Sequence, residues 1–310
     1  GSPLVIGIGI GENFIASDQL ALRQVTDRFV YLEEGDVAEI TPEQYSIFNA
    51  EFTPVSRDIT QIDAAAESVD KGHYRHFMLK EIYEQPSVIR RSLAGRLGSK
   101  KILVEAMGSH AGEILQNISS VQIVACGTSY HAGMVAKYWI EGLAGVPCRV
   151  EVASEFRYRK FKVQDNTLFI TISQSGETAD TLAALRLAKT LGYSASLTVC
   201  NVAQSSLVRE SDLYLMTEAG PEIGVASTKA FTTQLVALLF LTVALGRHHD
   251  MSSEQEEDIV AALNALPDLL AETLELNLDI KKMSNAFAEK HHALISTQKA
   301  IRLGNLNMAR

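Results

Sequence analysis

The sequence predicts an α/β protein whose main domain is a doubly wound parallel sheet with flanking helices, preceded by a β-rich segment. From residue 121 onward, short apolar runs alternate with helical stretches, as expected for a parallel sheet covered on both faces. Residues 1–40 instead hold several strand-like runs. With 310 residues and a hydrophobic fraction of 46%, the chain can bury a substantial core.

The first 70 residues predict strands followed by a linker. Strand-like runs cover 4–9, 14–18 and 28–32. After the turn at 33–36, residues 37–40 could return as a hairpin. Residues 41–70 are polar and mixed in composition, which indicates a fading strand and then a linker.

Helices are predicted next. Residues 74–82 look helical, and Pro86 is expected to open a second helix that runs to Leu93. A third helix is expected over 102–118, with two internal glycines tolerated.

The alternating part of the chain then begins. Strands are expected at 121–125, 149–152, 168–172, 196–199 and 212–216. Helices are expected at 131–143, 179–191 and 228–245. The apolar stretch 235–245 falls short of the roughly 18 residues that suggest a membrane span, so it predicts a buried helix and no membrane partner.

Charge and cysteine content exclude several classes of function. The net charge of −9 and the pI of about 5.4 are unlike a nucleic-acid-binding surface, so a phosphate ligand would have to be held by local donors. The three cysteines show neither CxxC nor metal spacing, which favours reduced thiols in a cytoplasm and no metal. The run GIGIG at 7–11 fails the dinucleotide pattern GxGxxG, because residue 12 is Glu.

The strongest local signal is the segment 173–178, with the sequence SQSGET, between a predicted strand and a predicted helix. Free backbone N–H groups and the positive end of the helix dipole converge at such a point, which suits a phosphate. Two further hydroxyl-rich loops, 126–129 and 224–228, also precede helices. Any one of them could be a simple N-cap. Together they indicate one anion site, and their hydroxyls can also bind those of a sugar.

Three other candidates have simpler interpretations. Cys126 could be a nucleophile at a helix N-terminus, although a small residue packed at a strand end is the preferred interpretation. Glu177 could be a general base, but a carboxylate in the first turn of a helix more simply complements the dipole. His291 and His292 lack a third metal ligand and are expected to be a surface pair.

These loops, with the third extended to 222–231, resemble the sugar-phosphate loops of a sugar isomerase (SIS) domain. Residues 74–86 resemble the entry to the synthase half of bacterial glutamine–fructose-6-phosphate aminotransferases (isomerising), also called glucosamine-6-phosphate synthases. Residues 1–7 and 16–18 resemble the closing strands of their glutaminase domain, an N-terminal-nucleophile amidohydrolase. The resemblance covers roughly residues 1–294.

The resemblance implies a ligand and its binding residues. Glutamine would supply ammonia that converts fructose 6-phosphate to glucosamine 6-phosphate in the cytoplasm, with no cofactor and with a homodimer formed through the SIS domain. Ser173, Ser175 and Thr178 would bind the phosphate, with help from Ser129. The sugar site would be lined by Gln174 and Thr128 and closed by Val225 and Ser227.

The resemblance also implies a division of the chain. The expected parts are a glutaminase remnant (1–62), a linker (63–72), a first SIS domain (73–294) and a divergent or truncated tail (295–310). The family's catalytic residues would lie outside this chain, which is expected to be an inactive fragment by itself. Two alternatives stay open: a non-catalytic sugar-phosphate-binding or regulatory SIS module, and a stand-alone phosphosugar isomerase with Glu177 as its base.

Overall fold

The computed structural model describes residues 4–17, 19–22, 25–61, 71–160, 162–287 and 289–290. The expected pair His291–His292, the tail 295–310 and most of the expected linker lie outside these ranges. The chain divides into two compact units, Gly1–Asp70 and Lys71–Arg310. The division falls inside the expected linker, while the other expected domain boundaries stay predictions.

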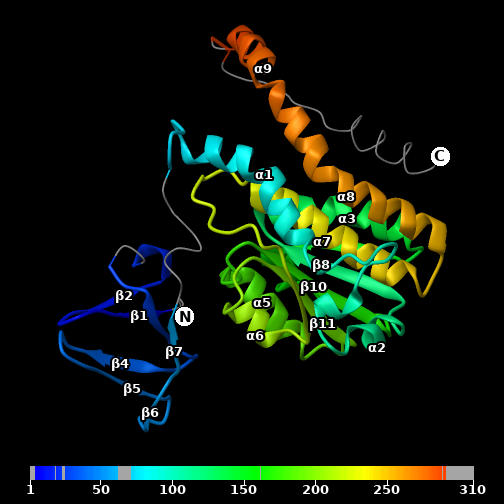
Figure 1. Ribbon diagram of the computed structural model, residues 1–310. Helices are drawn as coiled ribbons and strands as arrows, with labels where there is room; N and C mark the ends of the chain where they lie inside the picture. Colours follow the sequence, from blue (N-terminus) through cyan, green and yellow to red (C-terminus); the bar gives the residue numbers. More distant parts are fainter. Residues whose placement is uncertain are drawn as a thin grey trace. The chain divides into compact units, whose positions relative to one another are not determined.

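The first unit consists of two small antiparallel sheets (Figure 1). One sheet has the order β2-β1-β3-β7 and contains β1 (Val5–Ile8), β2 (Asn13–Ala16), β3 (Arg28–Tyr31) and β7 (Ile59–Gln61). The other has the order β4-β5-β6 and contains β4 (Val37–Ile40), β5 (Tyr45–Phe48) and β6 (Pro54–Val55).

Two expectations for this unit are wrong. Residues 37–40 do not return as a hairpin on the preceding strand: β4 pairs with β5, because β1 and β7 already occupy the two edges of β3. Residues 41–61 are not a fading strand and linker but hold β5, β6 and β7. These strands have two to four residues each, too few for a clear alternation of apolar and polar side chains.

The second unit is built on a five-stranded parallel sheet. Its strands are β8 (Ser120–Ala125), β9 (Cys148–Val152), β10 (Thr167–Ser173), β11 (Ala195–Cys200) and β12 (Leu213–Met216), in the order β12-β11-β10-β8-β9. The chain goes from β8 outward to β9 and then returns to β10 on the other side of β8. The strand order therefore reverses between β8 and β10, and ligands of doubly wound sheets bind at the carboxyl ends of the strands at such a switch point.

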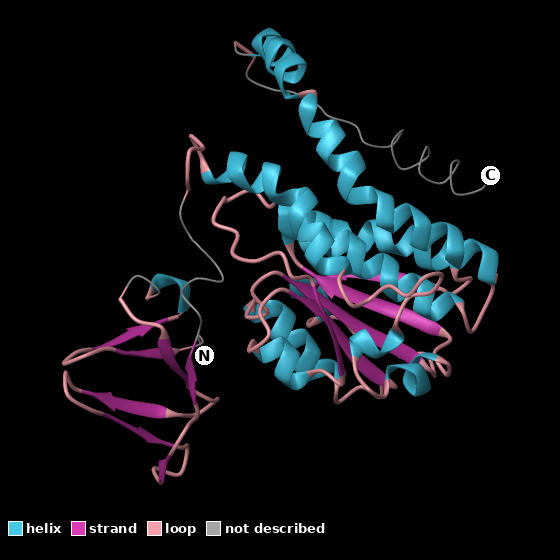
Figure 2. Ribbon diagram, in the orientation of Figure 1, coloured by secondary structure: helices cyan, strands magenta, loops and turns pink. Residues whose placement is uncertain are grey.

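Helices cover both faces of this sheet (Figure 2), so the predicted doubly wound α/β class is confirmed. One face carries α3 (Gly127–Leu143) and α7 (Lys229–Gly246), with α1 (Phe77–Leu93) and α8 (Ser253–Glu275) packed on them. The opposite face carries α4 (Ala153–Phe156), α5 (Ala179–Ala188) and α6 (Ser206–Glu210).

Helix α7 forms the centre of its layer. By length and composition it could cross a membrane, but 78% of its apolar window is buried inside the fold. It packs against α3, α1 and β11, which is the position of a core helix. The expected buried helix at 235–245 is confirmed as part of α7.

The helices before the sheet differ from expectation. Pro86 does not start a helix but lies inside α1. A proline cannot donate to the carbonyl four residues earlier, here that of Ile82, and the Gln85 side-chain amide donates to this oxygen instead at 2.9 Å.

The single helix expected over 102–118 is also wrong. Gly108 has a φ of +128° and ends a 3₁₀ turn (Val104–Met107), and a short helix α2 (Ala111–Leu115) follows. Helix α8 was not predicted, although its start carries a capping box in which Ser252 and Gln255 bond each other's backbone amides. Helix α9 (Asn277–Ser284), which follows α8, was not predicted either.

Candidate functional site

Two of the three predicted loops flank the switch point of the sheet. β8 runs into α3 through Cys126, and β10 runs into α5 through residues 174–178. Because β8 and β10 are parallel neighbours, both loops emerge at the same edge of the sheet. Neither N-cap side chain, that of Cys126 in α3 or of Thr178 in α5, bonds the first turn of its helix, and in the described part of the chain no other side chain accepts these N–H groups. Such helix N-termini attract anions.

The loop after β10 is a compact hydroxyl-lined turn. The hydroxyl oxygens of Ser173 and Thr178 lie 3.1 Å apart, and Ser173 Oγ accepts the Gly176 amide at 3.0 Å. Ser175 Oγ accepts the Glu177 amide at 3.2 Å. These bonds leave the hydroxyls further donor and acceptor capacity. The turn therefore gathers Ser173, Ser175 and Thr178 at the start of α5.

Gly176 lets this turn pack closely on its neighbours. Its φ is +71°, in the left-handed region that favours glycine. A Cβ built on it would lie 2.1 Å from Ser205 Oγ and 2.7 Å from Cys200 Sγ. The predicted loop thus depends on a glycine for its backbone conformation and for its packing.

Glu177 attaches the turn to α6, the neighbour of α5 in the same helical layer. Its carboxylate accepts the backbone N–H of Ser206, in the first turn of α6, at 2.6 Å. The expected interaction with a helix N-terminus is therefore made with α6 and not with its own helix α5. A structural role explains this carboxylate without proton transfer.

The loop after β8 presents one exposed and one buried hydroxyl. Thr128 is exposed in the first turn of α3, while Ser129 is buried. Gln234 of α7, which is 2% exposed, donates its Nε2–H to Ser129 Oγ at 3.0 Å. The Ser129 hydroxyl hydrogen is thereby free to point to a ligand. Gln234 was not predicted as a site residue; its signal in the sequence is an amide side chain directly before the apolar stretch 235–241 of α7.

The third loop, residues 217–228, joins β12 to α7 and differs from the other two. Glu222 accepts the amides of Thr228 at 2.8 Å and Ala230 at 3.1 Å, and it also accepts the Ser227 hydroxyl at 2.9 Å. A carboxylate of the chain itself therefore occupies the N-terminus of α7. The expectation that this helix start serves an anion is not met here, because Glu222 already fills it.

Asn201, which follows β11, connects the loop after β10 to the third loop. Its backbone N–H donates to Gln174 O at 3.3 Å, and its side-chain Oδ1 accepts the Ala219 backbone N–H at 2.8 Å. Its Nδ2 donates to Gly220 O at 2.8 Å. Gln174 and the start of the third loop are thus held on one asparagine, which the sequence analysis also missed.

Val225 and Ser227, the two residues expected to close the sugar site, lie in the third loop. The Val225 side chain is fully exposed, and the Ser227 hydroxyl is bonded to Glu222. For Ser227 to donate its hydroxyl hydrogen to a ligand and help close the sugar site, it would have to release its hydrogen bond to Glu222.

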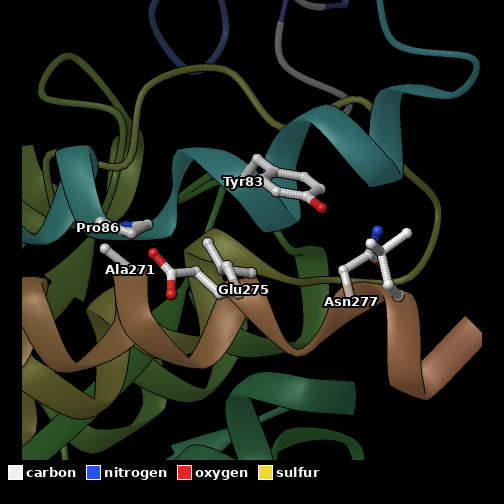
Figure 3. Close-up of a pocket in the computed structure, with 7 residues that line it drawn as sticks. Tyr83, Pro86, Ala271, Glu275 and Asn277 are labelled. Atoms are coloured by element: carbon white, nitrogen blue, oxygen red, sulfur yellow. The ribbon is translucent and has the colours of Figure 1, made fainter.

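A hollow on the surface lies between α1, the end of α8 and the start of α9 (Figure 3). It is lined by Tyr83, Pro86, Ala271, Leu274, Glu275, Asn277 and Leu278. None of the predicted site residues lines it.

Among the described residues, neither the cysteine thiols nor the His, Cys, Asp and Glu side chains form a further catalytic or metal-binding site. Burial raises the pKa of Cys148 to about 12 and also raises that of Cys200, so neither thiol is a nucleophile near neutral pH. Cys126 is half-buried, and its sulfur lies 4.0 Å from the Thr181 hydroxyl, which fits the packed interpretation. Within the described ranges no group of three or more His, Cys, Asp or Glu residues could hold a metal ion.

Comparison with known proteins identifies the domain. Residues 114–244, from α2 to the end of α7, match the family model described as "SIS domain". A putative phosphosugar isomerase from Clostridium difficile 630 has the same fold, with a TM-score of 0.58 at 20% identity over 69% of this chain and 57% of its own. The fold and the loops at its switch point therefore define a SIS-domain protein.

More similar relatives identify the family. The glutamine–fructose-6-phosphate aminotransferase (isomerising) of Pseudomonas syringae pv. tomato is 64% identical over 295 residues, which are 95% of this chain and 48% of the relative. That of Idiomarina loihiensis is 59% identical over 294 residues, again 95% of this chain and 48% of the relative. The C-terminal domain of glucosamine-fructose-6-phosphate aminotransferase from Francisella tularensis superposes with a TM-score of 0.70 at 48% identity, over 72% of this chain and 63% of its own.

The chain belongs to the glutamine–fructose-6-phosphate aminotransferase (isomerising) family, and it spans about half the length of the curated relatives it matches. The 295 aligned residues exceed the 240 residues of the second unit (71 through 310), so the similarity extends into the antiparallel strands of the first unit. This extension is consistent with the expected remnant of a glutaminase domain.

Proposed function

We propose that this chain supplies the sugar-phosphate-binding part of an enzyme that makes glucosamine 6-phosphate from fructose 6-phosphate and glutamine. The observation that carries the proposal is the pair of uncapped helix N-termini, α3 and α5, on the two sides of the switch point. With a net charge of −9, the chain offers an anion no general positive field, so local N–H and O–H donors must bind it.

Each predicted residue has a role in this proposal. Ser173, Ser175 and Thr178 bind the phosphate at the start of α5, with Ser129 as a donor from α3. Gln174 and Thr128 contact the sugar. Val225 and Ser227 approach it from the third loop, after Ser227 leaves Glu222.

The chain by itself is proposed to bind the sugar phosphate weakly and to catalyse nothing. The carboxylates in its loops, Glu177 and Glu222, already accept backbone amides, and this supports binding without proton transfer. The same observation supports the alternative of a non-catalytic SIS module. Formation of glucosamine 6-phosphate from fructose 6-phosphate and glutamine by the purified chain would contradict both.

The test of the binding proposal is titration of the purified chain with fructose 6-phosphate, glucosamine 6-phosphate and fructose. We expect both phosphates to bind in the millimolar range and fructose to bind at least about tenfold more weakly, because the donors face the phosphate. Ser175→Ala should weaken binding of the phosphates about three- to tenfold. Ser87→Ala, an exposed serine on α1, is the control and should leave it unchanged. Equal affinity for fructose and fructose 6-phosphate would contradict the proposal.

Homodimer formation through the SIS domain and a cytoplasmic location are further parts of the proposal, and the family relationship supports them. Light scattering of the purified chain tests the dimer. A monomer at all accessible concentrations would contradict it for this chain.

A further inference from the structure

The third loop has little regular structure of its own and is held by carboxylates. Figure 1 shows residues 217–228, coloured yellow, beside the start of α1. Ile223 is partly exposed and Val225 is fully exposed, so apolar packing does little to fix this stretch. Its position therefore depends on hydrogen bonds.

The contact with α1 is made by Glu81. One oxygen of its carboxylate, Oε1, accepts the backbone N–H groups of Ile223 at 2.6 Å and Gly224 at 2.9 Å. The side chain lies in the interior, with Glu81 only 2% exposed. Two successive amides on one buried oxygen form a short and directional attachment.

The fit between Glu81 and the loop is close. A Cβ built on Gly224 would lie 2.4 Å from Glu81 Oε2, so an added side chain here would have to displace either the loop or the carboxylate. Oε2 itself is buried and has no hydrogen-bond partner within the described ranges. A buried carboxylate with one unpartnered oxygen is costly, which indicates a role beyond packing.

A second contact places α1 against the end of the loop. Glu84 lies one turn after Glu81 on α1, and its Oε2 pairs with Lys229 Nζ at 2.7 Å. The Lys229 side chain is 5% exposed and belongs to the first residue of α7. Helix α1 therefore fixes the loop at 223–224 and again at 229, and Val225 and Ser227 lie between these points.

We propose that Glu81 is a positioning residue that anchors the 222–228 loop to α1 and so sets the approach of Val225 and Ser227 to the ligand. It acts through the backbone of Ile223 and Gly224 and does not touch the ligand. The ligand part of this inference rests on the proposed sugar-phosphate function; the anchoring part does not.

The first measurement is residue-resolved amide hydrogen exchange of the full chain without ligand. Glu81→Ala should speed exchange at Ile223 and Gly224 by at least about tenfold, with β10 and β11 unchanged. Glu81→Gln keeps an acceptor oxygen and should restore part of the protection. Glu113→Gln, whose side chain is 81% exposed on α2, is the control and should change neither amide. Wild-type exchange rates at both amides in a folded Glu81→Ala protein would overturn the proposal.

The second measurement is titration with fructose 6-phosphate. Glu81→Ala should weaken binding about three- to tenfold, and Glu81→Gln should weaken it less. Faster amide exchange with unchanged affinity would overturn the positioning role. If the wild-type chain does not bind fructose 6-phosphate, the proposed function fails, and the exchange rates alone decide whether Glu81 is an anchor.

A third variant tests the anchor without changing Glu81, so that the result does not depend on whether Glu81→Ala folds. Gly224→Ala keeps the carboxylate but forces the loop and the carboxylate apart, so it should reproduce both effects. Wild-type exchange at Ile223 in this variant would count against the anchor as well.

Discussion

Single residues decide whether the turn after β10 can form. Gly176 combines a positive φ with a direct approach to Ser205 and Cys200, so no other residue type fits without movement of its neighbours. On the other side of the switch point, the loop after β8 also depends on a single residue. The buried amide of Gln234 donates to Ser129 Oγ and so orients that hydroxyl.

Gly176→Ala is expected to destabilise the second unit by about 2 kcal/mol or more, since the new Cβ would overlap Ser205 Oγ and the backbone would be strained. Urea unfolding measures this. Gly142→Ala is the matched control: Gly142 lies in α3 with open space around its Cβ position, so alanine should stabilise by about 0.5–1 kcal/mol. Equal effects of the two changes would contradict the packing argument.

Gln234→Leu is expected to leave stability nearly unchanged, because it also removes the Gln234 oxygen that has no partner within the described ranges. Binding of fructose 6-phosphate should weaken about threefold or more, since the Ser129 hydroxyl could then turn toward the carbonyl of Cys126 or Ala125, three or four residues earlier. Titration tests this, with Thr242→Val as the control. Thr242 is buried in the same helix, and among the residues that the structure describes its hydroxyl bonds only the Leu238 carbonyl, so its replacement should leave affinity unchanged.

At the scale of elements, charged side chains join helices that are far apart in the sequence. Arg247 at the end of α7 donates from Nε to both carboxylate oxygens of Glu256 in α8, at 3.0 and 2.9 Å. Glu256 also accepts the Ile102 amide at 2.9 Å, and Arg247 donates to the Ile102 carbonyl. One partly buried ion pair thus connects α7, α8 and the segment that precedes α2.

The pair makes stability depend on pH. Burial raises the pKa of Glu256, but the hydrogen bonds from Arg247 and Ile102 outweigh it, so the pKa lies below its ordinary value of 4.5. A depressed carboxyl pKa stabilises the fold above the unfolded-state pKa, and this stability is lost as the pH falls through the folded-state pKa.

Glu256→Gln should therefore lower the free energy of unfolding by about 3 kcal/mol at neutral pH, because Arg247 would lose its charge partner. The difference in unfolding free energy between Glu256→Gln and the wild type should narrow as the pH falls through the folded-state pKa of Glu256, because the wild-type carboxyl then becomes protonated as well. Urea unfolding at neutral pH and over a series of acid pH values tests this, with the exposed Glu113→Gln as the control. A difference independent of pH would show that charge pairing is not its cause.

At the scale of the whole molecule, the two units differ in the size of their cores. The first unit buries two small clusters, with Val5, Leu22 and Phe29 in one and Ile6, Val30 and Ile47 in the other. It also exposes large apolar side chains, among them Ile10, Ile15 and Phe52. The second unit buries a continuous cluster across the sheet and the helices of one face.

We expect the first unit to open more easily than the second. Amides of β1 to β7 should exchange with deuterium at least about tenfold faster than those of β8, β10 and β11, because few apolar contacts oppose local opening. Hydrogen exchange followed by mass spectrometry measures this on the intact chain. Equal protection in the two units would contradict the comparison of their cores.

The parts of the fold and of the site that could be predicted are those that depend on residues adjacent in the sequence. The parallel strands and the segment 173–178 follow from short apolar runs and from turn residues at their ends, and the structure places both as predicted. Two failures have different causes. β4 cannot join β3 because β7, far along the chain, takes that edge. Pro86 lies inside α1 because the side chain of the preceding residue, Gln85, donates to the carbonyl that the proline leaves without its helical donor. The role of Glu222 could have been predicted from the sequence, because acidic residues shortly before a helix often accept hydrogen bonds from the N–H groups of its first turn.

The sequence by itself determined the class of fold, the family and the hydroxyl-rich turns, because these depend on residues adjacent in the chain. Only the tertiary structure decided what holds those turns. Glu81 lies 142 residues before the Ile223 amide that it binds, and Gln234 lies 105 residues after Ser129. The physical reason is that a buried polar group must find its partner in space, and the folded sheet, not the local sequence, brings such partners together.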